Sequence, residues 1–199
     1  MNNAELKQKA KEQMSGNIGI LIGCAAVVYV ASFLVSLIPM VGPLIVTILT
    51  PSLVLGITAI YINLTKGIVP QLGDVFKEIS RWLPAFILNI AISVFVFLWS
   101  LLLVVPGIIK SFSYSMSYYI LAENPDMTAK QSLNESKRIM DGHKMDYFML
   151  MLSFIPWIIL GVITCGLAFL YVIPYVSTAT ANFYNEIKGP AVNTSYQTY

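Results

Sequence analysis

The sequence predicts an all-α polytopic membrane protein, a bundle of about six transmembrane helices paired as three hairpins, with short cytoplasmic amphipathic helices. Three observations predict this class. Of the 199 residues, 57% are hydrophobic and only 11% are charged, whereas about 25% are charged in typical soluble domains. The apolar residues form uncharged runs of about 20 residues, the length that crosses a bilayer. The basic residues lie almost entirely between alternate runs, as membrane topology requires.

The first hairpin is predicted from two uncharged runs joined by a short turn. Residues 17–38 and residues 44–64 carry no charged side chain. At a rise of about 1.5 Å per residue, each run is long enough to span the hydrocarbon core. Pro39 and Pro43 lie between the runs, where they favour a tight reversal. Ahead of the hairpin, residues 1–16 alternate lysines with apolar residues at helical spacing, which predicts a cytoplasmic amphipathic helix at the membrane surface.

The second hairpin is predicted between residues 83 and 122. One charge, Lys110, lies in this stretch, and Pro106 followed by Gly107 interrupts it. Because this dipeptide ends a helix more readily than it continues one, we expect the third span to end there and a short, tilted fourth span to follow. A short surface helix is predicted before the hairpin, with one apolar face made of Val75, Phe76, Ile79 and Trp82.

The third hairpin follows another predicted surface helix. Thr128 and Gln131 have the spacing of a capping box, which begins that helix. The apolar stretch of residues 147–185 is too long for one span, and residues 164–166 are the best place for it to turn. A flexible cytoplasmic tail is predicted over residues 189–199. Together these elements form one integral membrane domain.

Lysine and arginine residues predict the orientation of this domain, residues 1–199. Eleven of the twelve basic residues fall on one side of the six-span layout, and only Lys110 lies elsewhere. Basic residues are retained on the cytoplasmic side of a membrane. We therefore expect both termini and both long connections to be cytoplasmic.

The ends of the three predicted hairpins share a short pattern. In each, an aromatic residue precedes a glycine or a proline by six positions. The three pairs are Tyr61 and Gly67, Tyr119 and Pro125, and Phe183 and Gly189. One interpretation is a pseudo-threefold internal repeat, and the other is chance recurrence of a short pattern.

The sequence offers little catalytic chemistry. All ten acidic residues lie in the tails and cytoplasmic connections, so no intramembrane carboxylate is available for a proton relay or a coupling cation. The single histidine, His143, has no ligand cluster around it, and Cys24 and Cys165 are predicted near opposite membrane faces. We therefore expect no enzyme activity, metal, cofactor or intrachain disulfide. The scattered basic residues also argue against a nucleic-acid partner.

Polar side chains line one face of each even-numbered span. The candidate ligand or partner contacts are Lys110, Tyr114 and Tyr118 on the fourth span, and Tyr171, Tyr175 and Asn182 on the sixth. Two interpretations stay open, namely hydrogen bonding between helices and a polar-lined groove among spans two, four and six. For Lys110 the alternatives are a side chain that reaches the external interface and one that contacts an anion or a lipid phosphate.

A series of ordered motifs runs through the second half of the chain. The motifs are VPGIIK at 105–110, YYILAENP at 118–125, SKRIMDG at 136–142, LSFI at 152–155 with Trp157, and Pro174-Tyr175. They resemble the bacterial membrane-protein family known as domain of unknown function 975. The resemblance extends over nearly the whole chain, and Pro156 departs from it where the family often has glycine. It implies a multi-pass protein of the bacterial cytoplasmic (plasma) membrane with no assigned reaction.

Two functions from different classes are therefore predicted. The leading hypothesis is a non-enzymatic membrane module that binds a lipid, a peptide or a partner helix. Membrane lipids are its expected partners, and a membrane protein or a second copy of the chain is a further candidate, because Gly19 and Gly23 form a motif that permits close helix approach. The alternative is a small transporter or an immunity or efflux-type permease.

Overall fold

The computed structural model describes residues 3–39, 41–102, 104–164 and 166–189. Every regular element within these residues is a helix, which confirms the all-α prediction. The helices are α1 (Asn3–Met14), α2 (Ile18–Ser36), α3 (Gly42–Thr65), α4 (Asp74–Lys77), the 3-10 helix η1 (Glu78–Arg81), α5 (Trp82–Leu102), α6 (Val104–Tyr114), α7 (Ser117–Glu123), α8 (Ala129–Ile139), α9 (Lys144–Leu152), α10 (Ile155–Ile163) and α11 (Phe169–Ile187).

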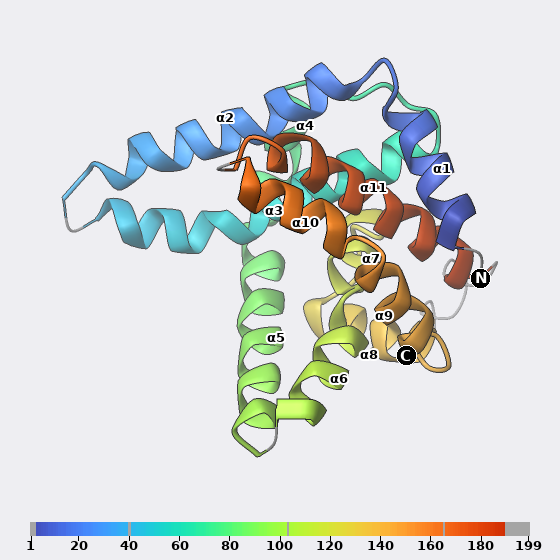
Figure 1. Ribbon diagram of the computed structural model, residues 1–199. Coiled ribbons are helices and arrows are strands. Elements are labelled where there is room, and N and C mark those ends of the chain that lie inside the picture. Colours follow the sequence, from blue (N-terminus) through green and yellow to red (C-terminus); the bar gives the residue numbers. More distant parts are fainter. Residues whose placement is uncertain (1–2, 40, 103, 165, 190–199) are drawn as a thin grey trace.

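Three helical hairpins extend from a common base (Figure 1). Helix α2 pairs with α3, α5 with α6, and α10 with the start of α11. We call the base the hub; it consists of α1, α7, α8 and the C-terminal halves of α3 and α11. Many large apolar side chains of the hairpins are exposed, and Phe33, Phe97 and Ile163 are each more than 60% exposed. In water such a surface would be unfavourable.

Four helical stretches in the described part of the chain are long and apolar enough to cross a membrane. They cover residues 18–36, 42–65, 74–100 and 144–163. Together with the exposed apolar side chains, these stretches indicate a membrane protein. The predicted fourth and sixth spans correspond to α6–α7 and α11, which do not combine the same length and hydropathy.

Two predicted spans are each broken into two helices. The predicted fourth span is divided between α6 and α7 at Ser115, and the predicted fifth span between α9 and α10 at Ser153. Both serine hydroxyls donate to main-chain carbonyls three residues earlier, Ser115 to Phe112 at 2.8 Å and Ser153 to Leu150 at 2.6 Å. Such bonds offer the backbone an alternative to continued helix.

The prediction that a turn lies at Pro106 and Gly107 is wrong. Helix α6 begins at Val104, so both residues belong to its first turn. A proline is tolerated there because the N–H groups of the first turn have no partner within the helix. Gly107 permits the close approach of the two legs, since a Cβ atom at this position would lie 2.4 Å from Ser100 Oγ.

The predicted amphipathic helices pack into the protein. Leu6, Ala10 and Met14 of α1 are at most 1% exposed, because this face packs on α11. The capping box predicted at the start of α8 is confirmed, with Thr128 and Gln131 each bonding the other's main-chain N–H. Protein rather than lipid covers these apolar faces.

The segment before α5 forms α4 and η1 rather than one continuous helix. Val75 is fully buried against α3, while Phe76 and Trp82 are about 40% exposed. Cys24 is buried and has no disulfide partner among the described residues. Cys165 lies outside the described residues, and so do residues 190–199 of the predicted tail, so these predictions stay predictions.

Candidate functional site

The ends of the three hairpins meet at one carboxylate in the hub. Glu123, the last residue of α7, accepts hydrogen bonds from Lys66 Nζ and Lys188 Nζ, each at 2.7 Å. The two lysines directly follow α3 and α11, respectively. The hydroxyl of Tyr184, which is fully buried, donates to the other oxygen of Glu123 at 2.7 Å. We call these four residues the Glu123 network.

The Glu123 carboxylate is only 17% exposed, yet its partners keep it charged. Burial raises its pKa, but the hydrogen bonds from Lys188, Lys66 and Tyr184 together outweigh this effect and lower the pKa to about 2. Opposite charges and donors close to a carboxylate favour the ionised form. At physiological pH the Glu123 carboxylate is therefore ionised, and its hydrogen bonds link the ends of the three hairpins.

The Glu123 network also bears on the predicted repeat. Lys66 and Lys188 each follow the aromatic residue of their pattern, Tyr61 and Phe183, by five positions. Both aromatic residues lie in the same buried cluster of the hub, and Tyr119 of the third pattern packs against it. The three patterns therefore converge in space. The pseudo-threefold repeat itself stays a prediction.

A second group of polar side chains lies along the α5–α6 hairpin. Lys110 Nζ of α6 lies 4.8 Å from the centre of the Trp99 ring of α5. Lys137 Nζ of α8 lies 5.7 Å from the Phe95 ring and 5.4 Å from the Tyr114 ring. These distances are typical of cation–π contacts. We call these five residues the lysine–aromatic face.

The two lysines of this face carry uncompensated charge. Within the described part of the chain, neither Lys110 nor Lys137 forms an ion pair, whereas the neighbouring Arg138 pairs with Glu135. Phe95 is 41% exposed and Trp99 is 37% exposed, one helical turn apart on the same side of α5. The face therefore presents two positive charges next to exposed aromatic rings.

A third group surrounds the base of the α10–α11 hairpin. The Tyr175 ring lies 5.2 Å from the Phe154 ring and 5.8 Å from those of Trp157 and Tyr171. Lys7 of α1 lies over Phe154 at 4.5 Å and donates to the Ser153 carbonyl at 2.6 Å. This aromatic cluster fixes the hairpin on α1.

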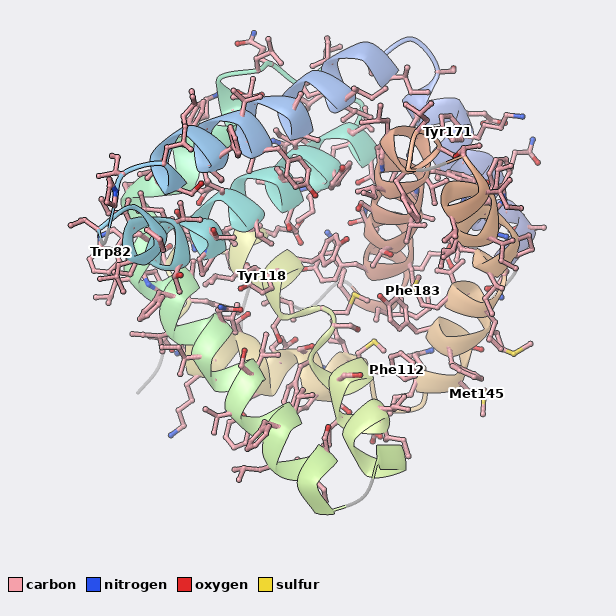
Figure 2. All side chains as sticks on the ribbon, turned by 60° about the vertical axis from the view of Figure 1, so that its left-hand side comes forward. Trp82, Phe112, Tyr118, Met145, Tyr171 and Phe183 are labelled. Atoms are coloured by element: carbon pink, nitrogen blue, oxygen red, sulfur yellow. The ribbon has the colours of Figure 1, made fainter. Side chains whose placement is uncertain are left out.

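The structure divides the six predicted contact residues among these places. Lys110 and Tyr114 belong to the lysine–aromatic face, and Tyr118 is half-buried in the apolar cluster that contains Tyr114. Tyr171 and Tyr175 belong to the aromatic cluster, and Figure 2 shows Tyr171 well separated from Tyr118. The sixth predicted residue, Asn182, contacts α1.

Asn182 is 7% exposed and exchanges two hydrogen bonds with Gln13, at 2.7 Å and 3.2 Å. Its side chain therefore joins α11 to α1. The six candidate residues predicted from the sequence include neither Glu123 nor Lys137. Their partners come from segments distant in sequence, so no local spacing could have revealed them.

Comparison with known protein families gives a match for the second half of the chain. Residues 101–191 match the family described as Protein of unknown function (DUF975). No curated protein and no solved structure matches this chain. The matched segment contains Lys110, Lys137, Glu123 and Lys188, whereas the resemblance of the first hundred residues stays a prediction. The match over residues 101–191 is to the same family that the motifs of this segment resemble.

Proposed function

We propose that this protein is a non-enzymatic membrane module that binds anionic phospholipids through its lysine–aromatic face. The observation that carries this proposal is the position of Lys110 and Lys137. Both ammonium groups lie over aromatic rings of the α5–α6 hairpin without an acidic partner among the described residues. Binding is the chemistry that such a face offers, because it contains no acid, base or nucleophile set.

The composition of the face suits the boundary between lipid and water. Tryptophan and tyrosine favour the headgroup level of a membrane, where one edge of the ring is wet and the other apolar. A lysine near an anionic lipid surface gains about 1 kcal/mol. Ile108 and Ile109 are nearer the hairpin turn than Lys110, and they are 47% and 46% exposed, as contact with acyl chains would require.

The proposed arrangement keeps the hub in the cytoplasm. It contains most of the buried polar side chains and the ends of the three hairpins, and the basic residues gather around it. The hairpins then enter the bilayer of a bacterial plasma membrane from the cytoplasmic side, with both chain termini cytoplasmic. Crossing by every hairpin would give the six spans predicted from the sequence, and crossing by α2–α3 alone would give two.

Lipid retention measured by native mass spectrometry tests this function. The protein is released from vesicles that contain equal amounts of phosphatidylglycerol and phosphatidylcholine, and bound lipids are counted. We expect wild type to retain phosphatidylglycerol preferentially. The Lys110→Ala/Lys137→Ala variant should lose about 2 kcal/mol of this preference, or about 30-fold in affinity.

A matched control removes two other lysines on the same side. Lys11 and Lys130 are exposed, and no aromatic ring or acidic group among the described residues holds either of them. The Lys11→Ala/Lys130→Ala variant has the same net charge as the Lys110→Ala/Lys137→Ala variant and should keep most of the preference for phosphatidylglycerol, because neither of its lysines lies over an aromatic ring in the described residues. Equal retention by all three proteins, or equal losses in both variants, would contradict binding at the lysine–aromatic face.

A further inference from the structure

We propose that the α5–α6 hairpin does not cross the membrane. It enters the cytoplasmic leaflet and turns back within the bilayer, so that Lys110 and Lys137 both contact anionic phosphates of that leaflet. The evidence is the position of α8 along the hairpin, together with the charges that α8 carries.

Helix α8 is bonded to the α6 leg close to the hairpin turn. Ser136 Oγ donates to the Ser113 carbonyl at 2.8 Å, and Ser132 Oγ donates to the Ser117 carbonyl at 2.5 Å, with all four residues buried. Ser113 is nine residues past Val104, where α6 begins. At about 1.5 Å per residue, α6 extends only about 14 Å beyond this bond.

The α5 leg gives a similar length. Lys137 Nζ lies 5.7 Å from the Phe95 ring, and Phe95 is seven residues before Leu102, where α5 ends. Seven residues of helix cover about 10 Å. Even with the reach of a lysine side chain added, the hairpin extends about half of the roughly 30 Å of a hydrocarbon core beyond α8.

Helix α8 itself belongs in water or at the headgroups. Lys130, Asn134 and Arg138 are exposed on its outer face, and its apolar face packs on α5, α6 and α7. Exposed cationic side chains are strongly unfavourable in hydrocarbon. Therefore α8 marks the cytoplasmic boundary of the bilayer, and the tip of the hairpin lies near the bilayer centre.

With the α5–α6 hairpin placed in this way, Lys110 no longer lies on the opposite side of the membrane from the other basic residues. Lys110 is three residues from Ser113, so its backbone lies about 5 Å beyond the level of the α8 bond. A lysine side chain reaches the headgroups from that depth. All twelve lysine and arginine residues then lie on the cytoplasmic side, whereas six crossings leave Lys110 on the opposite side.

Cysteine labelling from each side of the membrane tests the placement. Lys110→Cys is introduced into a protein that also carries Cys24→Ala and Cys165→Ala, and a membrane-impermeant maleimide is added to inside-out and right-side-out vesicles. We expect at least tenfold faster labelling in inside-out vesicles. Labelling from the outer face, or from neither side, would overturn the re-entrant hairpin.

Two further variants complete the experiment. Ser111→Cys is nearly isosteric and repeats the test one residue farther along α6, where the side chain is half-exposed. Lys137→Cys is the control for cytoplasmic accessibility. Only the identity of the lipid rests on the proposed function, because labelling does not depend on lipid type. The lipid-retention experiment therefore tests the proposed function, and the side from which the cysteines are labelled tests the placement of the hairpin.

Discussion

Replacing Glu123 by glutamine removes the charge at which the ends of α3, α7 and α11 meet. The amide is similar in shape, but Lys66 and Lys188 then lie close together without the carboxylate that holds them. We expect the Glu123→Gln variant to be less stable than wild type at neutral pH. The Lys66→Met variant should lose less stability than Glu123→Gln, because Lys66 is 43% exposed and Lys188 still pairs with Glu123.

The pKa of Glu123 sets the size of the effect. Lowering it from 4.5 to about 2 corresponds to at most about 3 kcal/mol of stability. Because Lys66 is partly exposed and screened by solvent, we expect about 2 kcal/mol. A carboxyl group whose pKa is lowered by folding stabilises the protein above its unfolded pKa. This contribution is complete above pH 4.5 and is lost as the pH falls toward 2.

Unfolding in mixed micelles of mild detergent and sodium dodecyl sulfate, followed by tryptophan fluorescence, measures the difference. Wild type should be more stable than Glu123→Gln by about 2 kcal/mol between pH 5 and pH 8. The gap should narrow at pH 3. If wild type and Glu123→Gln have the same free energy of unfolding at pH 7, or if their difference is the same at pH 3 as at pH 7, an ionised Glu123 does not stabilise the hub.

Three other substitutions test the packing. Gly56→Ala would place a Cβ atom 2.2 Å from the Val75 carbonyl oxygen, so we expect a loss of about 1–3 kcal/mol by the same unfolding assay; wild-type stability would show that α4 does not pack there. Gly107→Ala should separate α5 from α6 by meeting Ser100, seen as increased proteolysis of this hairpin alone. Thr128→Ala removes the capping box and should cost about 1 kcal/mol, and no change would mean that α8 needs no cap.

Much of the helical pattern could be predicted from the sequence, because uncharged runs and their interruptions are local signals. The runs at 17–38 and 44–64 correspond to α2 and α3 within two residues at each end. The capping box at Thr128 also appears as predicted. A span broken at Ser115 could not be predicted, since serine is common within membrane helices and its effect depends on packing.

The packing of polar segments could not be predicted from composition. An amphipathic helix such as α1 has the same sequence pattern whether lipid or α11 covers its apolar face. The level of α8 along the hairpin depends on the pairing of Ser136 with Ser113, which are distant in sequence. The six-span layout assumed that each apolar run extends freely from the polar connections, and the proposed re-entrant hairpin differs from it for this reason.

Labelling of two single cysteines in a chain without Cys24 and Cys165 tests most directly whether the hub stays in the cytoplasm while apolar hairpins enter the bilayer. Asp126→Cys lies in the exposed hub segment between α7 and α8, and Leu37→Cys lies at the tip of the α2–α3 hairpin, where Leu37 is 61% exposed. An impermeant maleimide should label Asp126→Cys only in inside-out vesicles and Leu37→Cys only in right-side-out vesicles. Labelling of both positions from the same side, or of Asp126→Cys from outside, would contradict this arrangement.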